Sequence, residues 1–276
     1  MIEWGVRQSP GDLAFLSASI LLALLAAAGF AALLLAHGLL DGLNALPDNS
    51  WWLQYRDPGP RVSAAPLWRI GAAAVGALVS LAAVFRLRAL YRREPSPVLP
   101  FIMVFLFSLG VECLRAGTAI LFALDGPVSP SILLTRVIYW GRFVGMLGLL
   151  TASLYCTDLK YRKLFSIAGV VFLVSFVMAA YIPLDRSVFL VQLTWKLGDE
   201  QSVWFVNLAI GALAILTAVA AGFTRGSPRF VLLAVAITVL VGSRELLFFA
   251  SQPVLLGTGI VAQAAGAALC ARAFAT

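Results

Sequence analysis

Hydrophobic residues fall into eight long runs along the chain, and polar or proline-containing stretches separate one run from the next. A bilayer core of about 30 Å needs roughly 20 apolar residues in a helix. Because lipid offers no partner for an unpaired backbone amide or carbonyl, such runs cross a membrane as α-helices. The pattern predicts an all-α polytopic transmembrane helix bundle of about eight helices, over residues 13–36, 67–85, 98–124, 132–156, 164–182, 203–223, 230–250 and 254–271.

Three stretches need a closer look. The run 13–36 is longer than the apolar core of a signal peptide, about 7–15 residues, and follows Glu3 and Asp12 instead of a basic stretch, so we expect a retained helix. Only residues 251–253 separate the last two runs, which form either a tight hairpin or a pair with one re-entrant helix. The stretch 186–198 is too short and too charged to span, and predicts either a helix in the outer interface or an ordered loop.

Basic residues gather in alternate connections, after the second, fourth, sixth and eighth runs. They are Arg86, Arg88, Arg92, Arg93, Lys160, Arg162, Lys163, Arg225, Arg229 and Arg272. The other connections carry mixed or acidic charge. Because short cytoplasmic loops are enriched in Lys and Arg, we expect both termini in the cytoplasm of a multi-pass protein in the cell inner membrane. Residues 1–276 are expected to form a single transmembrane domain.

The composition excludes several classes of function. Hydrophobic residues make up 61% of the chain and charged residues only 12%, against roughly 25% charged residues in soluble proteins. The net charge of +7 is dispersed and forms no basic face, so we expect no nucleic-acid partner. Cys113, Cys156, Cys270 and His37 lack metal-ligand spacing, which predicts neither a metal nor a cofactor. Since no connection can hold a soluble domain, we expect a protein partner or a homo-oligomer, surrounded by membrane lipids.

Six ionisable residues lie inside the predicted helices, away from the helix ends. They are Glu112 and Arg115 in the third run, Arg136 and Arg142 in the fourth, and Arg244 and Glu245 in the seventh. A charge at the bilayer centre costs on the order of 2.5–3.5 kcal/mol on insertion scales, so such side chains face protein or water. These six residues are our candidate site, either as a ligand-binding set or as a buried charge network.

Depth in the membrane suggests which of these charges meet. With a rise of about 1.5 Å per residue, Glu112 and Arg142 lie at similar depth, and Glu245 matches Arg136. Four arginines against two glutamates leave an excess of positive charge. A ligand carboxylate, a phosphate or a lipid headgroup can complete the set, because a guanidinium binds such groups in a bidentate fork.

The alternative is a closed network that only holds the helices together. Its further partners would be backbone carbonyls, waters and the side chains of Thr118, Thr135, Tyr139 and Ser243. In the fourth run, Gly141 and Gly145 have the small-xxx-small spacing that lets two helices approach closely, which indicates packing.

Catalytic motifs are absent from the sequence: there is no nucleophile elbow and no Ser/His/Asp set, so we do not expect an enzyme. The first hypothesis is a ligand-binding bundle, sensor-like or transporter-like, with an outward-facing Arg/Glu site for an anionic or lipid ligand. The second is a non-catalytic subunit that anchors or scaffolds a larger membrane complex. An enzyme acting on a lipid substrate comes third.

Overall fold

The computed structural model describes residues 65–124, 127–157, 164–189 and 192–275. Within these ranges seven helical segments are long and apolar enough to cross a membrane. The predicted all-α multi-pass bundle is therefore confirmed, and seven of the predicted spans are present. The first predicted helix, 13–36, lies outside the described residues.

The helices begin and end close to the predicted positions, and several are longer than their apolar runs. They are α3 (Ala65–Arg93), α4 (Val98–Val111), α5 (Leu114–Ala123), α6 (Val128–Cys156), α7 (Leu164–Tyr181), α8 (Glu200–Arg225), α9 (Pro228–Phe249) and α10 (Pro253–Ala273). Helix α3 extends beyond Phe85 to the basic pair Arg92 and Arg93. Positive charge in the last turn is favourable because it faces the negative end of the helix dipole.

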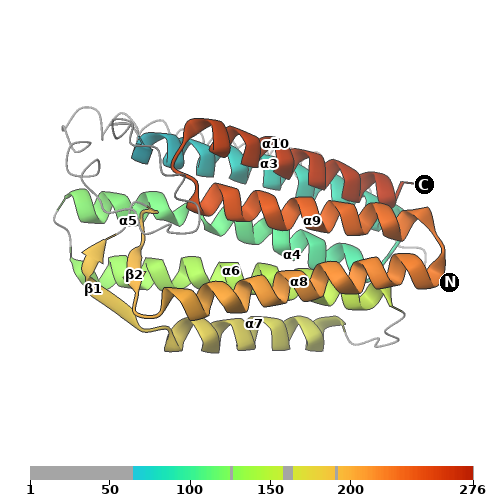
Figure 1. The fold of residues 1–276 in the computed structure, drawn as a ribbon, viewed down its shortest axis with the longest axis horizontal. Helices are drawn as coiled ribbons and strands as arrows, with labels where there is room; N and C mark the ends of the chain where they lie inside the picture. Colours follow the sequence, from blue (N-terminus) through green and yellow to red (C-terminus); the bar gives the residue numbers. More distant parts are fainter. Residues whose placement is uncertain (1–64, 125–126, 158–163, 190–191, 276) are drawn as a thin grey trace.

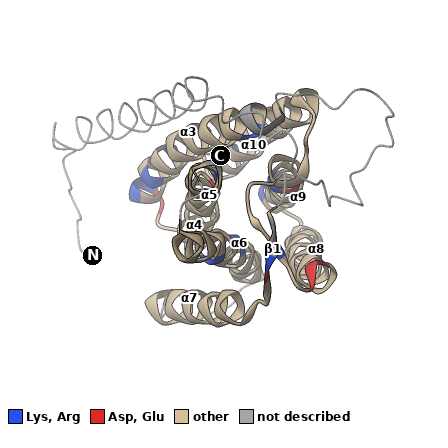
Figure 2. Cartoon of the chain, turned by 90° about the vertical axis from the view of Figure 1, so that its left-hand side faces the viewer, with Lys and Arg blue, Asp and Glu red and all other residues tan. Residues whose placement is uncertain are grey.

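Six helices form a closed ring around the molecular axis. Helix α3 packs against α4, α4 against α6, α6 against α8, α8 against α9, α9 against α10, and α10 returns to α3. Helix α7 lies outside this ring against α6, as the view along the bundle shows (Figure 2). Helices α9 and α10 are both long enough to span and pack side by side as a tight hairpin, so the re-entrant alternative is wrong.

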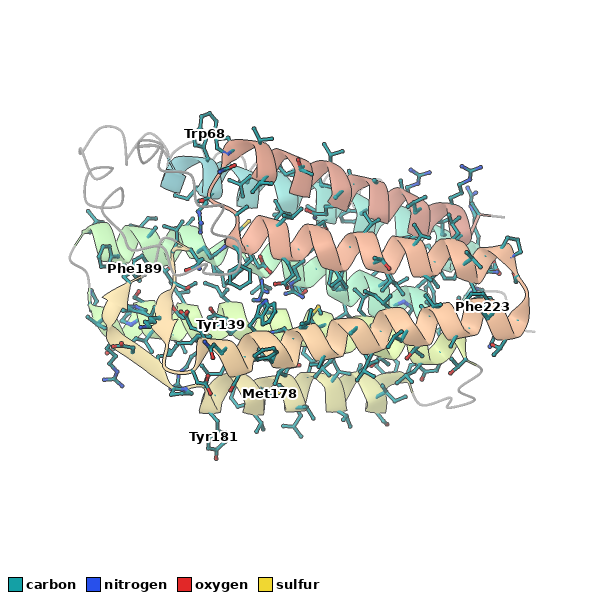
Figure 3. All side chains as sticks on the ribbon, viewed as in Figure 1. Trp68, Tyr139, Met178, Tyr181, Phe189 and Phe223 are labelled. Atoms are coloured by element: carbon teal, nitrogen blue, oxygen red, sulfur yellow. The ribbon has the colours of Figure 1, made fainter. Side chains whose placement is uncertain are left out.

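The two ends of the bundle differ in charge and in structure. The basic ends of α3, α8 and α10 lie at one end, and a two-stranded sheet lies at the other (Figure 1). Side chains that point away from the bundle mark both ends: Trp68 and Tyr181 at the sheet end, and Phe223 at the basic end (Figure 3). Trp and Tyr are favoured at membrane interfaces. These aromatic side chains fit a bundle whose two ends reach the two membrane surfaces.

The core of the basic half is built from large side chains on some helices and small ones on others. Phe105 and Leu240 are fully buried, and Ala214, Ala218 and Gly266 allow neighbouring helices to approach. A Cβ atom at Gly266 would lie 2.8 Å from Cγ of Leu240. Because lipid is as apolar as these side chains, close packing of this kind is what holds membrane helices together.

The segment after α7 forms a hairpin of strands β1 (Leu184–Phe189) and β2 (Trp195–Leu197), which pair antiparallel. The interfacial helix expected over 186–198 is therefore wrong. The hairpin buries Phe189, Leu193 and Trp195 against α3 and α5. An interfacial helix would have placed its apolar face in lipid, whereas the hairpin places these side chains on the protein.

Candidate functional site

The third predicted span changes its hydrogen bonding where its first charged residue occurs. It is present as Val98–Phe122, and a short turn at Glu112 and Cys113 separates its two parts, α4 and α5. The amides of Glu112, Cys113 and Arg115 donate to the carbonyls of Leu109, Gly110 and Glu112, at 3.2, 3.1 and 3.1 Å. These bonds span three residues instead of four, which is the tighter 3₁₀ pattern. The break lies at the centre of the candidate site.

Glu112 is the centre of the charge cluster. Its Oε1 lies 3.0 Å from Nε of Arg244 and 3.5 Å from Nη1 of Arg142. Its Oε2 lies 3.7 Å from Nη2 of Arg115. All four side chains are 4% exposed or less. One buried carboxylate is therefore shared by three guanidinium groups, which come from α5, α6 and α9.

Arg142 connects Glu112 to the second carboxylate of the cluster, Glu245, whose Oε1 lies 2.8 Å from Nη2 of Arg142. The predicted contact between Glu112 and Arg142 is confirmed. The predicted proximity of Glu245 to Arg136 is wrong, because Arg136 donates instead to the Ala180 carbonyl on α7 at 2.8 Å. Six residues turn a helix by about 600°, so Arg136 and Arg142 leave α6 on different faces.

Backbone carbonyls supply many of the remaining acceptors. Arg115 donates to the carbonyls of Phe248 and Leu247, both at 3.3 Å, and to that of Glu112 at 3.2 Å. Arg244 donates to the Arg142 carbonyl at 3.0 Å. Leu247 and Phe248 lie in the last turn of α9, where carbonyls have no partner within the helix. Arg115 therefore caps the end of α9.

Arg69 was not predicted as a buried charge, but like Arg115 it donates to a carbonyl at the end of α9. It is 1% exposed, and its Nη2 donates to the Phe249 carbonyl at 3.1 Å. Arg69 is the third residue of the predicted run 67–85, too close to the start of that run to be counted among the charges inside the helices. Because α3 begins at Ala65, Arg69 lies in its second turn and turns inward.

Aromatic rings cover the guanidinium groups. The Phe248 ring lies between Arg142 and Arg115, at 3.8 and 4.9 Å from the two guanidinium carbons to the ring centroid. Arg244 lies over Phe105 at 5.4 Å. The Tyr139 ring meets Phe248 edge-on, at 5.9 Å between centroids. Cation–π contacts of this kind are attractive, and the rings keep lipid away from the charges.

The small residues of α6 make room for the cluster. A Cβ atom at Gly145 would lie 2.1 Å from Oγ of Ser108 and 2.4 Å from Nη1 of Arg244. At Gly141 it would lie 2.9 Å from Cγ1 of Val111. The Gly141–Gly145 pair therefore allows α4 to pack closely on α6, as its spacing predicts, and also lets the Arg244 guanidinium reach α6.

Three of the hydroxyl groups expected as partners of the arginines, those of Thr118, Thr135 and Ser243, bond to the hairpin or to their own helix instead. Thr118 donates to the Leu193 carbonyl, and Trp195 donates through Nε1 to Ser131 at 2.8 Å and through its amide to Thr135 at 3.4 Å. Ser243 donates to the Leu240 carbonyl of its own helix. The hairpin is thereby fixed on α5 and α6, at the sheet end of the bundle.

The charges of the cluster do not balance among the described residues. Arg115, Arg142 and Arg244 face Glu112 and Glu245, which leaves a formal excess of one positive charge, and Arg136 donates instead to the Ala180 carbonyl. Nη2 of Arg244 and Oε2 of Glu245 are buried and have no hydrogen-bond partner in the described part of the chain. Within those residues, no three His, Cys, Asp or Glu side chains are placed to hold a metal ion. A guanidinium nitrogen without a partner is a donor that an anion can accept from.

A comparison with protein-family models gives no match for this sequence, and a comparison with curated proteins gives no significant match either. The function must therefore be argued from the geometry of the charge cluster.

Proposed function

We propose that this multi-pass membrane protein is a ligand-binding bundle, sensor-like or transporter-like, whose buried Arg/Glu cluster binds an anionic group from the outer side. The group is a carboxylate or a phosphate, either free in solution or carried by a lipid. The observation that carries the proposal is Nη2 of Arg244, a guanidinium nitrogen on a fully buried side chain without a partner among the described residues.

The energetics favour an additional anion. Each buried charge costs on the order of 2.5–3.5 kcal/mol to insert, and an uncompensated partner of a buried pair typically costs about 3–5 kcal/mol. Two carboxylates neutralise only two of the three guanidinium groups that they contact. A bound anion would supply the missing charge and accept a charge-assisted hydrogen bond from Nη2 of Arg244.

The placement of the cluster supports the same class of function. Arg142 of α6 and Arg244 of α9 are both buried and both pair with Glu112. Glu112 lies at a turn of 3₁₀ helix within the spanning segment Val98–Phe122, and such a turn inside a longer helix often marks a functional hinge. The basic connections at the opposite end support an outward-facing site in the cell inner membrane.

Thermal unfolding of the detergent-purified protein tests the proposal. Acetate or phosphate should raise the melting temperature of the parent saturably, since a ligand at 100 times its dissociation constant stabilises by about 2.7 kcal/mol. Arg244→Gln should remove that response. The matched control is Arg229→Gln, because Arg229 forms an exposed pair with Glu94 at 3.1 Å and should leave the response unchanged.

A second experiment distinguishes a lipid headgroup from a free anion as the ligand. The parent is compared in nanodiscs of neutral lipid and in nanodiscs containing phosphatidylglycerol. Stabilisation by phosphatidylglycerol but not by free phosphate or acetate identifies a lipid ligand. If neither carboxylates, phosphates nor anionic lipids change the melting temperature of the parent protein, the proposal is contradicted.

One observation favours a second candidate, a non-catalytic subunit of a larger membrane complex. All three guanidinium nitrogens of Arg115 already have protein acceptors, as expected of a network that only joins helices. On that hypothesis, Gln at Arg115, Arg142 or Arg244 lowers the melting temperature, and no added anion changes it in the parent.

A further inference from the structure

The Glu112 carboxylate lies among the guanidinium groups of Arg115, Arg142 and Arg244. We propose that Glu112 is an exchangeable internal counter-ion: a ligand carboxylate or phosphate enters the cluster by displacing it, and Glu112 moves on the break between α4 and α5. This inference rests on the proposed function and describes how the same site is regulated.

The contacts of Glu112 suit exchange. Only one of its three ion pairs is short, 3.0 Å to Arg244, and the other two are 3.5 and 3.7 Å. A carboxylate that is spread over three partners at these distances makes one strong hydrogen bond and two weaker electrostatic contacts. An incoming anion therefore competes with one strong bond instead of three.

Each arginine keeps another acceptor when Glu112 leaves. Arg142 retains Glu245 at 2.8 Å, and Arg244 retains the Arg142 carbonyl at 3.0 Å. Arg115 retains the carbonyls of Leu247 and Phe248. The three guanidinium groups would stay in place around the vacated position, ready to receive an anion of similar charge.

The backbone at Glu112 can supply the movement. The amide bonds around Glu112 follow the 3₁₀ pattern, which within a longer helix often marks a hinge. Two residues before Glu112, Gly110 has no side chain and no atom within 4 Å of the position where one would begin. A change of pairing at this break would rotate Glu112 without unwinding α4 or α5.

Competition between the Glu112 carboxylate and the ligand predicts in which direction the dissociation constant changes when Glu112 is replaced. A carboxylate attached to the protein acts at an effective concentration in the millimolar range or above, so its removal should strengthen ligand binding. Glu112→Gln should bind acetate or inorganic phosphate about tenfold more tightly than the parent, measured as dissociation constants from melting-temperature titrations. Glu94→Gln is the control, since it removes an exposed carboxylate that pairs with Arg229, and should leave the dissociation constants unchanged.

A second variant tests whether the vacated position accepts an anion. Glu112→Ala should melt at a lower temperature than the parent, and formate should restore the loss in a saturable manner because it replaces the missing carboxylate. Formate should give no such rescue of Glu94→Ala. If Glu112→Gln fails to fold, Glu112→Asp takes its place in the titration, because it keeps the charge but withdraws the carboxylate by one methylene.

The outcomes separate the two proposals. Acetate or phosphate binding to the parent that is no tighter in Glu112→Gln, or absence of formate rescue in Glu112→Ala, overturns the exchange and leaves the proposed anion site standing. A parent that responds to no anion overturns both. Tighter binding in Glu112→Gln together with formate rescue supports the exchange.

Discussion

The arginine side chains of the cluster donate to a mixture of carboxylates and backbone carbonyls. At the end of α9 the acceptors are mainly carbonyls. Arg115 and Arg69 together take the carbonyls of Leu247, Phe248 and Phe249. The end of a helix carries partial negative charge and unpaired carbonyls. Buried arginine at such an end therefore costs less than the same residue facing apolar side chains.

The Gly145 position allows a direct test of the packing around Arg244. Gly145→Ala would place a methyl group 2.1 Å from Oγ of Ser108 and 2.4 Å from Nη1 of Arg244. Overpacking of this kind typically costs about 1–3 kcal/mol, so we expect a lower melting temperature and a weaker response to acetate. Gly242→Ala on α9 is the control, because no atom lies within 4 Å of its Cβ position.

An alanine at Gly242 should be neutral or stabilising by about 0.5–1 kcal/mol, as for glycine in a helix interior. If Gly145→Ala behaves like Gly242→Ala, the Arg244 guanidinium does not pass Gly145 as described.

The sequence identified most of the charged residues but not how they face one another. Depth along a helix is readable from spacing, and it placed Glu112 beside Arg142 correctly. Rotation about the helix axis depends on packing, which the spacing does not determine, so Arg136 was assigned to the wrong partner. Arg69 was missed because the start of α3 lies before its apolar run.

At the level of elements, α8 begins with a side-chain cap that responds to pH. The Asp199 carboxylate accepts hydrogen bonds from the Ser202 hydroxyl and from its amide at 3.1 Å, and these bonds lower the pKa of Asp199. A lowered folded-state pKa means that the contribution of the cap is present above the unfolded pKa of about 3.9. It is lost as the pH falls through the folded-state value.

Hydrogen exchange at the first turn of α8 should therefore lose protection as the pH falls from about 3.9 through the lower folded-state pKa of Asp199. Asp199→Asn is the matched variant, because Asn is also a favourable cap and does not titrate. Its first turn should keep the same protection over that range. Equal loss of protection in the parent and the Asn variant would contradict the role given to Asp199.

Two elements were beyond what the sequence could predict. The break between α4 and α5 contains no proline, and glycines such as Gly110 are common in continuous membrane helices. The hairpin after α7 depends on contacts that are distant in sequence, among them the stack of Phe189 on Phe122 at 4.3 Å. Leu193 adopts a φ of 62° in the connection between the strands, a conformation that a bulky residue rarely adopts.

For the whole molecule, the basic end of the bundle is proposed to face the cytoplasm. Single cysteines at Arg92 and at Arg186, each exposed at opposite ends of the described bundle, test this in a background where Cys113, Cys156 and Cys270 are Ala. A membrane-impermeant maleimide added to intact cells should label the Arg186→Cys protein and spare Arg92→Cys. Labelling of Arg92→Cys alone would reverse the orientation and place the site toward the cytoplasm.

The position of Arg142 halfway along α6 has an electrical consequence. A monovalent anion that reaches this depth from outside crosses about half of the transmembrane voltage, and a full crossing is worth about 2.3 kcal/mol per 100 mV. With the cell interior negative, each additional 100 mV would weaken binding of the anion roughly sevenfold. An energised membrane would thus favour the empty cluster, and depolarisation would load it.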